Sequence, residues 1–212
     1  MFALLGAFVR AASAMLPNEM VVFFRNALVL VFLMPLFAAR RSLPAMSGGK
    51  MHLHVLRASA GLVSMYCYFY ALAHMKLAEA VLLSYTSPLF IPIIAFLWLH
   101  EPLNRRIRIA VLIGFAGVLL ILKPGLSIFQ PVALVALSAA LFASLAMVTI
   151  RRMSDTERPE SIVFFFTLLS TVISAVPLTW AWQVPGREAL VILVFLGLAA
   201  MAGQLLITKG YG

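Results

Sequence analysis

Acidic residues and cysteine are scarce in this sequence. Only 7 of the 212 residues are Asp or Glu, and charged residues of both signs make up 11%, whereas soluble domains carry about 25%. The single cysteine, Cys67, excludes a disulfide scaffold, and 12 Gly with 11 Pro are too few for a collagen-like or low-complexity chain. No apolar segment contains the paired carboxylates that general acid–base catalysis commonly uses.

Motifs of phosphate-binding, metal and nucleophilic sites are also missing. The run Ser47-Gly48-Gly49-Lys50 lacks the first glycine and the following Ser or Thr of a phosphate-binding loop. His52 and His54 lie close together, but no Cys, His or acidic partner stands at metal-ligand spacing. Neither a Gly-x-Ser-x-Gly nor a His-Glu-x-x-His motif occurs. We therefore expect no enzymatic activity, no metal and no cofactor.

Apolar residues dominate what is present. They make up 64% of the chain, and the mean hydropathy is +1.06. A soluble protein of this size could not hide so much apolar surface, so the sequence predicts a multi-pass integral membrane protein. The apolar runs are continuous rather than alternating, which favours helices over barrel strands. The expected spans are 1–16, 20–39, 55–73, 77–99, 107–122, 131–150, 161–182 and 189–208.

The basic residues predict how the chain is oriented in the membrane. Sixteen Lys and Arg give a formal net charge of +9, but they lie in short clusters between apolar runs, so no nucleic-acid partner is expected. Eleven lie in one set of alternate links and four in the other, with Arg25 inside a span. The positive-inside rule places the richer set in the cytoplasm, and we expect the bacterial cytoplasmic membrane as the location. That set comprises Arg40, Arg41, Lys50, Arg57, Arg105, Arg106, Arg108, Arg151, Arg152, Arg158 and Lys209.

The chain also contains a weak internal repeat. An offset of 141 residues aligns 8–28 with 149–169 and matches 7 of 21 positions, including Arg10 with Arg151 and Glu19 with Glu160. Five helices separate the corresponding elements, and because five is odd the second unit is inverted relative to the first, as in many secondary transporters. We predict an all-α fold of inverted five-helix repeats, 1–125 and 126–212. The repeat length implies a truncated chain with about eight of ten helices; the alternative is a complete eight-helix protein.

Several short motifs follow one another along the chain. They are Pro17-Asn18-Glu19 with Phe23-Phe24-Arg25-Asn26, Tyr70-Ala71-Leu72, Ala78-Glu79-Ala80, Tyr85-Thr86-Ser87-Pro88, and His100-Glu101-Pro102-Leu103 followed by Gly117-Val118. In their order and spacing these motifs resemble the EamA-type transporters of the drug/metabolite transporter superfamily. One departure is Ala110, where the family often has glycine. The resemblance implies a ten-helix inverted-repeat fold that carries small metabolites such as amino acids or amines, often outward.

Arg25 is the most conspicuous charged residue inside an expected span, with Asn26 beside it in the motif. Charges inside a membrane are usually functional. Arg25 is, however, only about 8 Å past the start of the apolar run at about 1.5 Å per residue, so its side chain can also reach the headgroups. Arg25 and Asn26 are therefore candidate cavity residues, and anchoring of Arg25 at the interface remains the alternative.

Two further groups of polar residues are candidates for the substrate cavity. Tyr66 and Tyr70 recur with His74 at a spacing of four, which puts them on one helical face; this face lines the cavity or makes hydrogen bonds between helices. In the fourth span, prolines leave carbonyl groups without a helical partner, and freed carbonyls form polar sites in transporters. The candidates there are Ser84, Tyr85, Thr86 and Pro88.

The last candidates concern packing and coupling. Ala110, Gly114 and Gly117 form a small-residue face suited to close packing, within the chain or in a homodimer. Glu101 precedes Pro102 at a span end, which is typical of a helix start with proline at its first position rather than of a proton-coupling acid. We expect a secondary carrier that acts by alternating access, with a small-molecule substrate and membrane lipid as partners. The alternatives are a non-transporting membrane partner and an intramembrane lipid-modifying enzyme.

Overall fold

The computed structural model describes residues 2–40, 50–122 and 131–211, and within these ranges every regular element is a helix. The expected turns at 47–49 and 123–125, and the expected boundary between the repeats at residue 125, lie outside the described residues. The elements are α1 (Phe2–Ser13), α2 (Asn18–Arg40), α3 (Met51–His74), α4 (Leu77–Ser84), α5 (Ser87–Ile94), η1 (Ala95–Leu99), α6 (Arg105–Leu122), α7 (Pro131–Ser154), α8 (Pro159–Ala175), α9 (Leu178–Ala181) and α10 (Arg187–Tyr211).

The predicted all-α polytopic membrane fold is confirmed. Each of the eight expected apolar segments falls on one helix or on a run of consecutive helices. Five of these are long and apolar enough to cross a membrane, and α8 is a shorter apolar helix. The five are Asn18–Pro35, Met51–His74, Leu77–Leu99, Pro131–Ser154 and Arg187–Gly210.

The fourth span is broken near its proline, as the sequence predicts. α4 ends at Ser84 and α5 begins at Ser87, with Pro88 in the first turn of α5. Because Pro88 has no N–H, the carbonyl of Ser84 has no helical donor, and the hydroxyl of Ser87 donates to it at 2.8 Å instead. The span then passes into the π-helix η1 and ends at His100, whose φ of 57° is left-handed.

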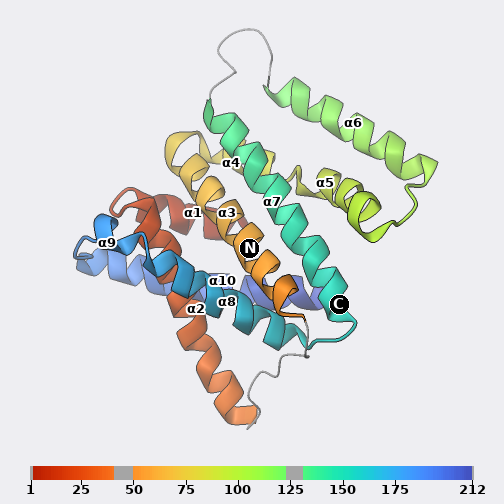
Figure 1. Ribbon diagram of the computed structural model, residues 1–212. Helices are drawn as coiled ribbons and strands as arrows, with labels where there is room; N and C mark the ends of the chain where they lie inside the picture. The colour runs from red at the N-terminus through yellow and green to blue at the C-terminus, as the bar shows by residue number, and fades with distance from the viewer. Residues whose placement is uncertain (1, 41–49, 123–130, 212) are drawn as a thin grey trace.

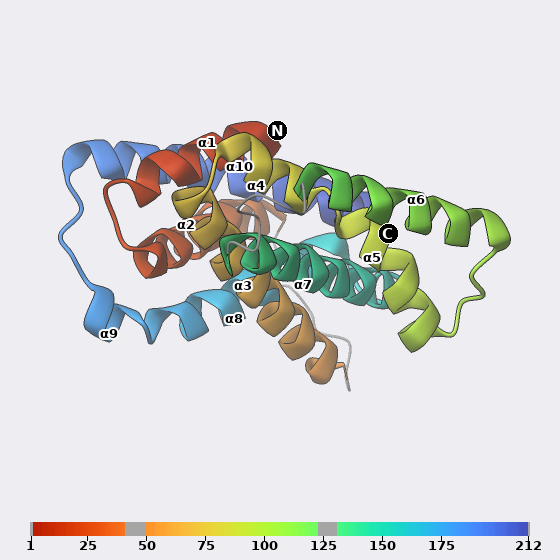
Figure 2. The ribbon, with the colours of Figure 1, turned by 90° about the horizontal axis from the view of Figure 1, so that it is seen from above.

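The helices pack in pairs that join the two halves of the chain. The most extensive contact is between α3 and α7, which run side by side in Figure 1, and α2 packs against both α8 and α10. Figure 2 shows α1 lying along α10. The main buried core gathers side chains from eight helices, α1, α2, α3, α4, α6, α7, α8 and α10, or from residues beside them.

This contact pattern has the symmetry expected of two related repeats. The 141-residue offset relates α1 to the end of α7, α2 to α8, and α3 to α10. Exchanging the related helices turns the α3–α7 contact into α10–α1, and the α2–α10 contact into α8–α3; all four are present. The α2–α8 contact maps onto itself. The division into repeats stays a prediction, and this pattern agrees with it.

α6 lies at the edge of the molecule, packed mainly on α5 (Figures 1 and 2). Of the three predicted packing residues, Gly114 fits that role, because a Cβ there would lie 2.3 Å from a methyl carbon of Leu89 on α5. Ala110 is exposed, and a Cβ at Gly117 would meet nothing within 4 Å. These two residues therefore make no close packing within the chain, because α6 approaches its neighbour closely at Gly114 and not along the whole face. Packing of this face in a homodimer stays a prediction.

Candidate substrate cavity

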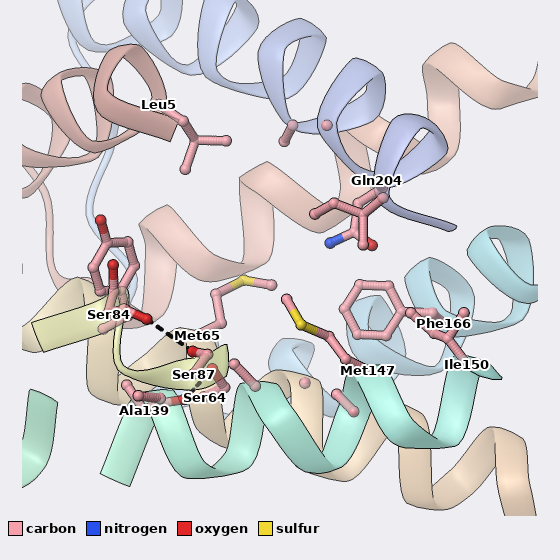
Figure 3. Close-up of a pocket in the computed structure, with 18 of the residues that line it drawn as sticks. Leu5, Ser64, Met65, Ser84, Ser87, Ala139, Met147, Ile150, Phe166 and Gln204 are labelled. Carbon is pink, nitrogen blue, oxygen red and sulfur yellow. Dashed lines mark hydrogen bonds between the residues drawn. The ribbon is translucent and has the colours of Figure 1, made fainter. Parts of the chain in front are cut away.

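A cavity of about 340 Å³ lies between helices from both halves of the chain. Figure 3 shows Leu5 of α1 and Gln204 of α10 on one side, with Ala139 and Met147 of α7 on the other. Its volume falls within the range of small-molecule sites, about 300–1,000 Å³. The lining residues are Leu5, Arg25, Arg57, Gly61, Ser64, Met65, Tyr68, Phe69, Ser84, Tyr85, Ser87, Pro88, Ala139, Ala140, Ala143, Ala146, Met147, Ile150, Phe166, Ala200, Gly203, Gln204 and Ile207.

α3 contributes one face to this cavity. Arg57, Gly61, Ser64 and Tyr68 recur at intervals of four, three and four residues, which places them along one side of a helix. The hydroxyl of Ser64 donates to the carbonyl of Ala139 at 2.8 Å and so ties this face to α7. Tyr68 and Arg57 therefore stand at the two ends of a continuous stripe along the cavity wall.

Arg57 joins three helices at the cavity. Its guanidinium carbon lies 4.0 Å from the centre of the Phe166 ring on α8, and Nη2 donates to Oε1 of Gln204 on α10 at 3.1 Å. The side chain folds back along α3 over Gly61, where a Cβ would lie 2.4 Å from Nη1 and 2.6 Å from the Phe166 ring. A residue without a side chain is thus required at position 61 for Arg57 to reach Phe166.

Arg25 is buried beside the same cavity rather than extended to the membrane surface. Its side chain is 5% exposed, and Nη1 donates to Oδ1 of Asn26 at 2.7 Å. Asn26 is fully buried and does not line the cavity; its Nδ2 donates to the carbonyl of Val22 at 3.0 Å and approaches the sulfur of Met65 at 3.7 Å. Asn26 therefore positions Arg25, and of the two candidates Arg25 alone faces the cavity.

The broken fourth span supplies a second wall. Ser84, Tyr85 and Pro88 line the cavity together with Ser87, as Figure 3 shows for the two serines. Thr86 does not line it, because its hydroxyl points back along the helix and donates to the carbonyl of Leu83 at 2.7 Å. The break therefore brings three of its four candidate residues to the cavity.

Tyr66 and Tyr70 do not line this cavity, and that prediction needs correction. Residues two positions away from the cavity stripe of α3 lie on nearly the opposite side of the helix. The Tyr66 hydroxyl is buried without a hydrogen-bond partner among the described residues, and its ring packs against the core. Tyr70 is 40% exposed and stacks on His74, with ring centroids 4.1 Å apart.

Sequence reasoning missed a buried pair outside the cavity. Nε2 of His54, on α3, lies 2.7 Å from Oε2 of Glu157, in the loop after α7, and both side chains are almost completely buried. The His54 ring also packs on Phe165, with centroids 4.8 Å apart. No signal in the sequence links these residues, because they are more than 100 positions apart and belong to different halves of the chain.

Glu101 also differs from the prediction. α6 begins at Arg105, not at Pro102, so the expected helix start with proline at its first position is wrong. Oδ1 of Asn104 accepts from the backbone N–H of Arg106 at 2.9 Å and takes the capping role. Glu101 instead makes a bidentate pair with Arg151 of α7, both contacts being 3.1 Å.

The described residues include no group of three His, Cys, Asp or Glu side chains that could hold a metal ion. The cavity offers groups that can bind a ligand: two guanidinium groups, an amide and aromatic hydroxyls in a mainly apolar wall.

Comparison with known proteins agrees with this architecture. The model of the EamA-like transporter family matches residues 1–123. The pseudopaline exporter CntI of Pseudomonas aeruginosa is 34% identical over 99% of this chain and 74% of its own length. A riboflavin transporter of Vibrio cholerae is 26% identical over 92% of this chain and 66% of its own. A solved crystal structure at 20% identity shares the fold, with a TM-score of 0.66 over 97% of this chain and 76% of that one.

The helices that can cross a membrane, the family match and these relatives together make the chain a multi-pass integral membrane protein that transports small metabolites. The relatives are named as transporters and not as enzymes. The chain belongs to the EamA-like transporter family.

Proposed function

We propose that this protein is a secondary carrier of the cytoplasmic membrane that moves a small metabolite by alternating access. The observation that carries the proposal is the cavity, because its wall takes residues from both predicted repeats. The first repeat contributes residues of α1 to α5, and the second contributes residues of α7, α8 and α10. A site at the interface of inverted repeats becomes accessible from either side when one repeat moves against the other.

Three polar contacts between the predicted repeats fit this mechanism. Lys50 with Thr156, His54 with Glu157, and Glu101 with Arg151 each join the first predicted repeat to the second. All three lie at the end of the molecule that the positive-inside count places in the cytoplasm. In the proposed cycle these contacts close the cavity on that side and break when the cavity opens to the cytoplasm. Substrate that binds one state more tightly than the other shifts the balance between them.

The test is transport by the purified protein in proteoliposomes. Uptake and counterflow of a broad panel of radiolabelled metabolites, with and without a pH gradient, should reveal saturable flux for at least one compound. No saturable flux for any member of the panel would contradict the proposal and favour a non-transporting membrane protein.

A matched pair of variants on α7 tests whether the cavity is the transport site. Ala143 lines the cavity, whereas Leu141, two residues away, is 41% exposed on the outer face of the helix. Ala143→Trp should fill the cavity and abolish flux, and Leu141→Trp should leave flux unchanged. If Ala143→Trp does not give a monodisperse protein, Ala143→Leu narrows the same wall with less bulk. Equal flux in wild type and the Ala143 variants would place the transport site elsewhere.

A further inference from the structure

The charges that line the cavity are all of one sign. Among the described residues that line it, Arg25 and Arg57 are the ones with ionised side chains, and no Asp, Glu, Lys or His is among them. Their side chains are 5% and 6% exposed, and both line the same cavity. A buried charge is unfavourable unless it is paired, and two like charges in one cavity raise that cost.

The contacts that the described residues make with Arg25 and Arg57 do not neutralise either charge. Arg25 donates to the Asn26 amide, and Arg57 donates to the Gln204 amide and lies over the Phe166 ring. These partners are all neutral. None of the ion pairs found among the described residues involves either arginine, and Nε of Arg57 is buried without a hydrogen-bond partner.

We propose that the cavity binds a small amphipathic organic anion through its carboxylate, which faces the guanidinium groups of Arg25 and Arg57. This inference rests on the proposed function and names the substrate class of the same site. The remaining wall is mostly apolar, with Met65, Met147 and Ile150 labelled around the cavity in Figure 3, and it suits an apolar substrate body. Binding supplies the negative charge that the folded chain lacks there.

The serine hydroxyls of the wall are already engaged, which leaves the guanidinium groups as its charged donors for a substrate carboxylate. The three serine hydroxyls already donate to main-chain carbonyls: Ser64 to Ala139, Ser84 to Val81, and Ser87 to Ser84. The planar guanidinium groups remain as the charged donors, and a guanidinium matches the two oxygens of a carboxylate.

The same arrangement disfavours amines. A protonated amine would be repelled by both arginines, and its N–H groups would find no carboxylate among the lining residues. A zwitterionic amino acid would satisfy the arginines with its carboxylate but would leave its ammonium group unpaired. The carboxylate-bearing compounds without an ammonium group are therefore the favoured members of the metabolite class that the family resemblance implies.

A charge series with one apolar body tests the inference on the unmodified protein. The probes are 3-phenylpropionate, 3-phenylpropionamide and 3-phenylpropylamine, titrated calorimetrically into the detergent-solubilised protein, with blank titrations into protein-free micelles. We expect the carboxylate to bind at least about tenfold more tightly than the amide, because a charge-assisted hydrogen bond replaces a neutral one, and the amine to bind weakest. Inorganic phosphate should not displace the carboxylate. Equal binding of carboxylate and amide, preference for the amine, or displacement by phosphate would each overturn the proposal.

Substitutions of the two arginines test whether they cause the preference for the carboxylate over the amide. Arg57→Gln and Arg25→Gln should each reduce the carboxylate-to-amide ratio toward one, while Arg187→Gln, which removes an exposed charge at the start of α10, should leave it unchanged. A ratio that survives both cavity substitutions would overturn the assignment. If either variant fails to fold, the charge series on the wild type still decides the matter.

Flux measurements separate this inference from the proposed function. Preferential binding of the carboxylate without flux of any compound would contradict the carrier function and leave the anion site supported. Saturable flux of amides or amines, without carboxylate preference, would support the carrier function and overturn the anion site.

Discussion

His54 and Glu157 form a buried contact between the start of α3 and the loop after α7, and its removal should be costly. Oε2 of Glu157 lies 2.7 Å from Nε2 of His54, and the side chains are 1% and 0% exposed. Nδ1 of His54 has no hydrogen-bond partner, so Glu157 is the one polar contact of the ring among the described residues. Glu157→Ala should destabilise the protein by about 1–3 kcal/mol, because it leaves the buried imidazole without its one polar contact.

The free energy of unfolding can be measured by denaturation in mixed micelles, with tryptophan fluorescence as the signal. Asp155→Ala is the matched control, because Asp155 is an exposed acid in the same loop and its loss should change the free energy by less than about 0.5 kcal/mol. His54→Ala and the double variant complete a double-mutant cycle. We expect a coupling energy of at least about 1 kcal/mol, since the side chains are in direct contact.

Two results would refute this reasoning. If Glu157→Ala were no more destabilising than Asp155→Ala, the carboxylate would not be buried against the imidazole. If the two single substitutions were additive in the double variant, their costs would come from separate losses, such as the packing of His54 on Phe165, and not from the contact between them.

Three further substitutions test the packing of the helices. Gly61→Ala should displace the Arg57 guanidinium, because the two atoms nearest the new Cβ, Nη1 of Arg57 and a ring carbon of Phe166, lie at the ends of side chains that can move. Carboxylate binding should fall about tenfold with little change in the free energy of unfolding. Unchanged binding would argue against Arg57 as a ligand. Gly197→Ala, whose Cβ would meet a side chain of α2 at 2.7 Å, should lower the free energy of unfolding by about 1–3 kcal/mol. Gly117→Ala is the control, because its Cβ points into open space and should leave the free energy of unfolding nearly unchanged. Equal losses in the two variants would contradict the α2–α10 packing. Tyr66→Phe removes a buried hydroxyl without a partner, so neither substrate affinity nor stability should fall, and a weaker affinity would return Tyr66 to the site.

The positions of the helices could be predicted because the bilayer demands a minimum apolar length. The segment 77–99 was expected from hydropathy alone, and the helices there run from Leu77 to Leu99. Its break was also predictable, because proline removes a specific backbone donor whatever the surroundings. Both predictions rest on local backbone chemistry, which needs no knowledge of which helices are neighbours.

The face of α3 that lines the cavity could not be predicted in the same way. In a soluble helix the apolar side marks the core, but in a membrane both lipid and protein interior are apolar, so hydropathy does not separate them. α3 carries two polar stripes, and the sequence alone does not show which one lines the cavity. One holds Tyr66 and Tyr70, and the other holds Arg57 and Tyr68. The second lies against α7 and the cavity, and the decisive fact is a contact between halves of the chain that no local pattern encodes.

Arg57 shows why a charge count predicts orientation better than it predicts function. The residue was one of eleven basic residues assigned to the cytoplasmic links, yet the structure buries it against Phe166 and Gln204. Removing it from the count leaves ten against four, so the predicted orientation does not change. The positive-inside rule depends on totals and tolerates one misassigned charge. A substrate site depends on individual residues, and a basic residue within two turns of a helix start can therefore contribute to both the count and the cavity.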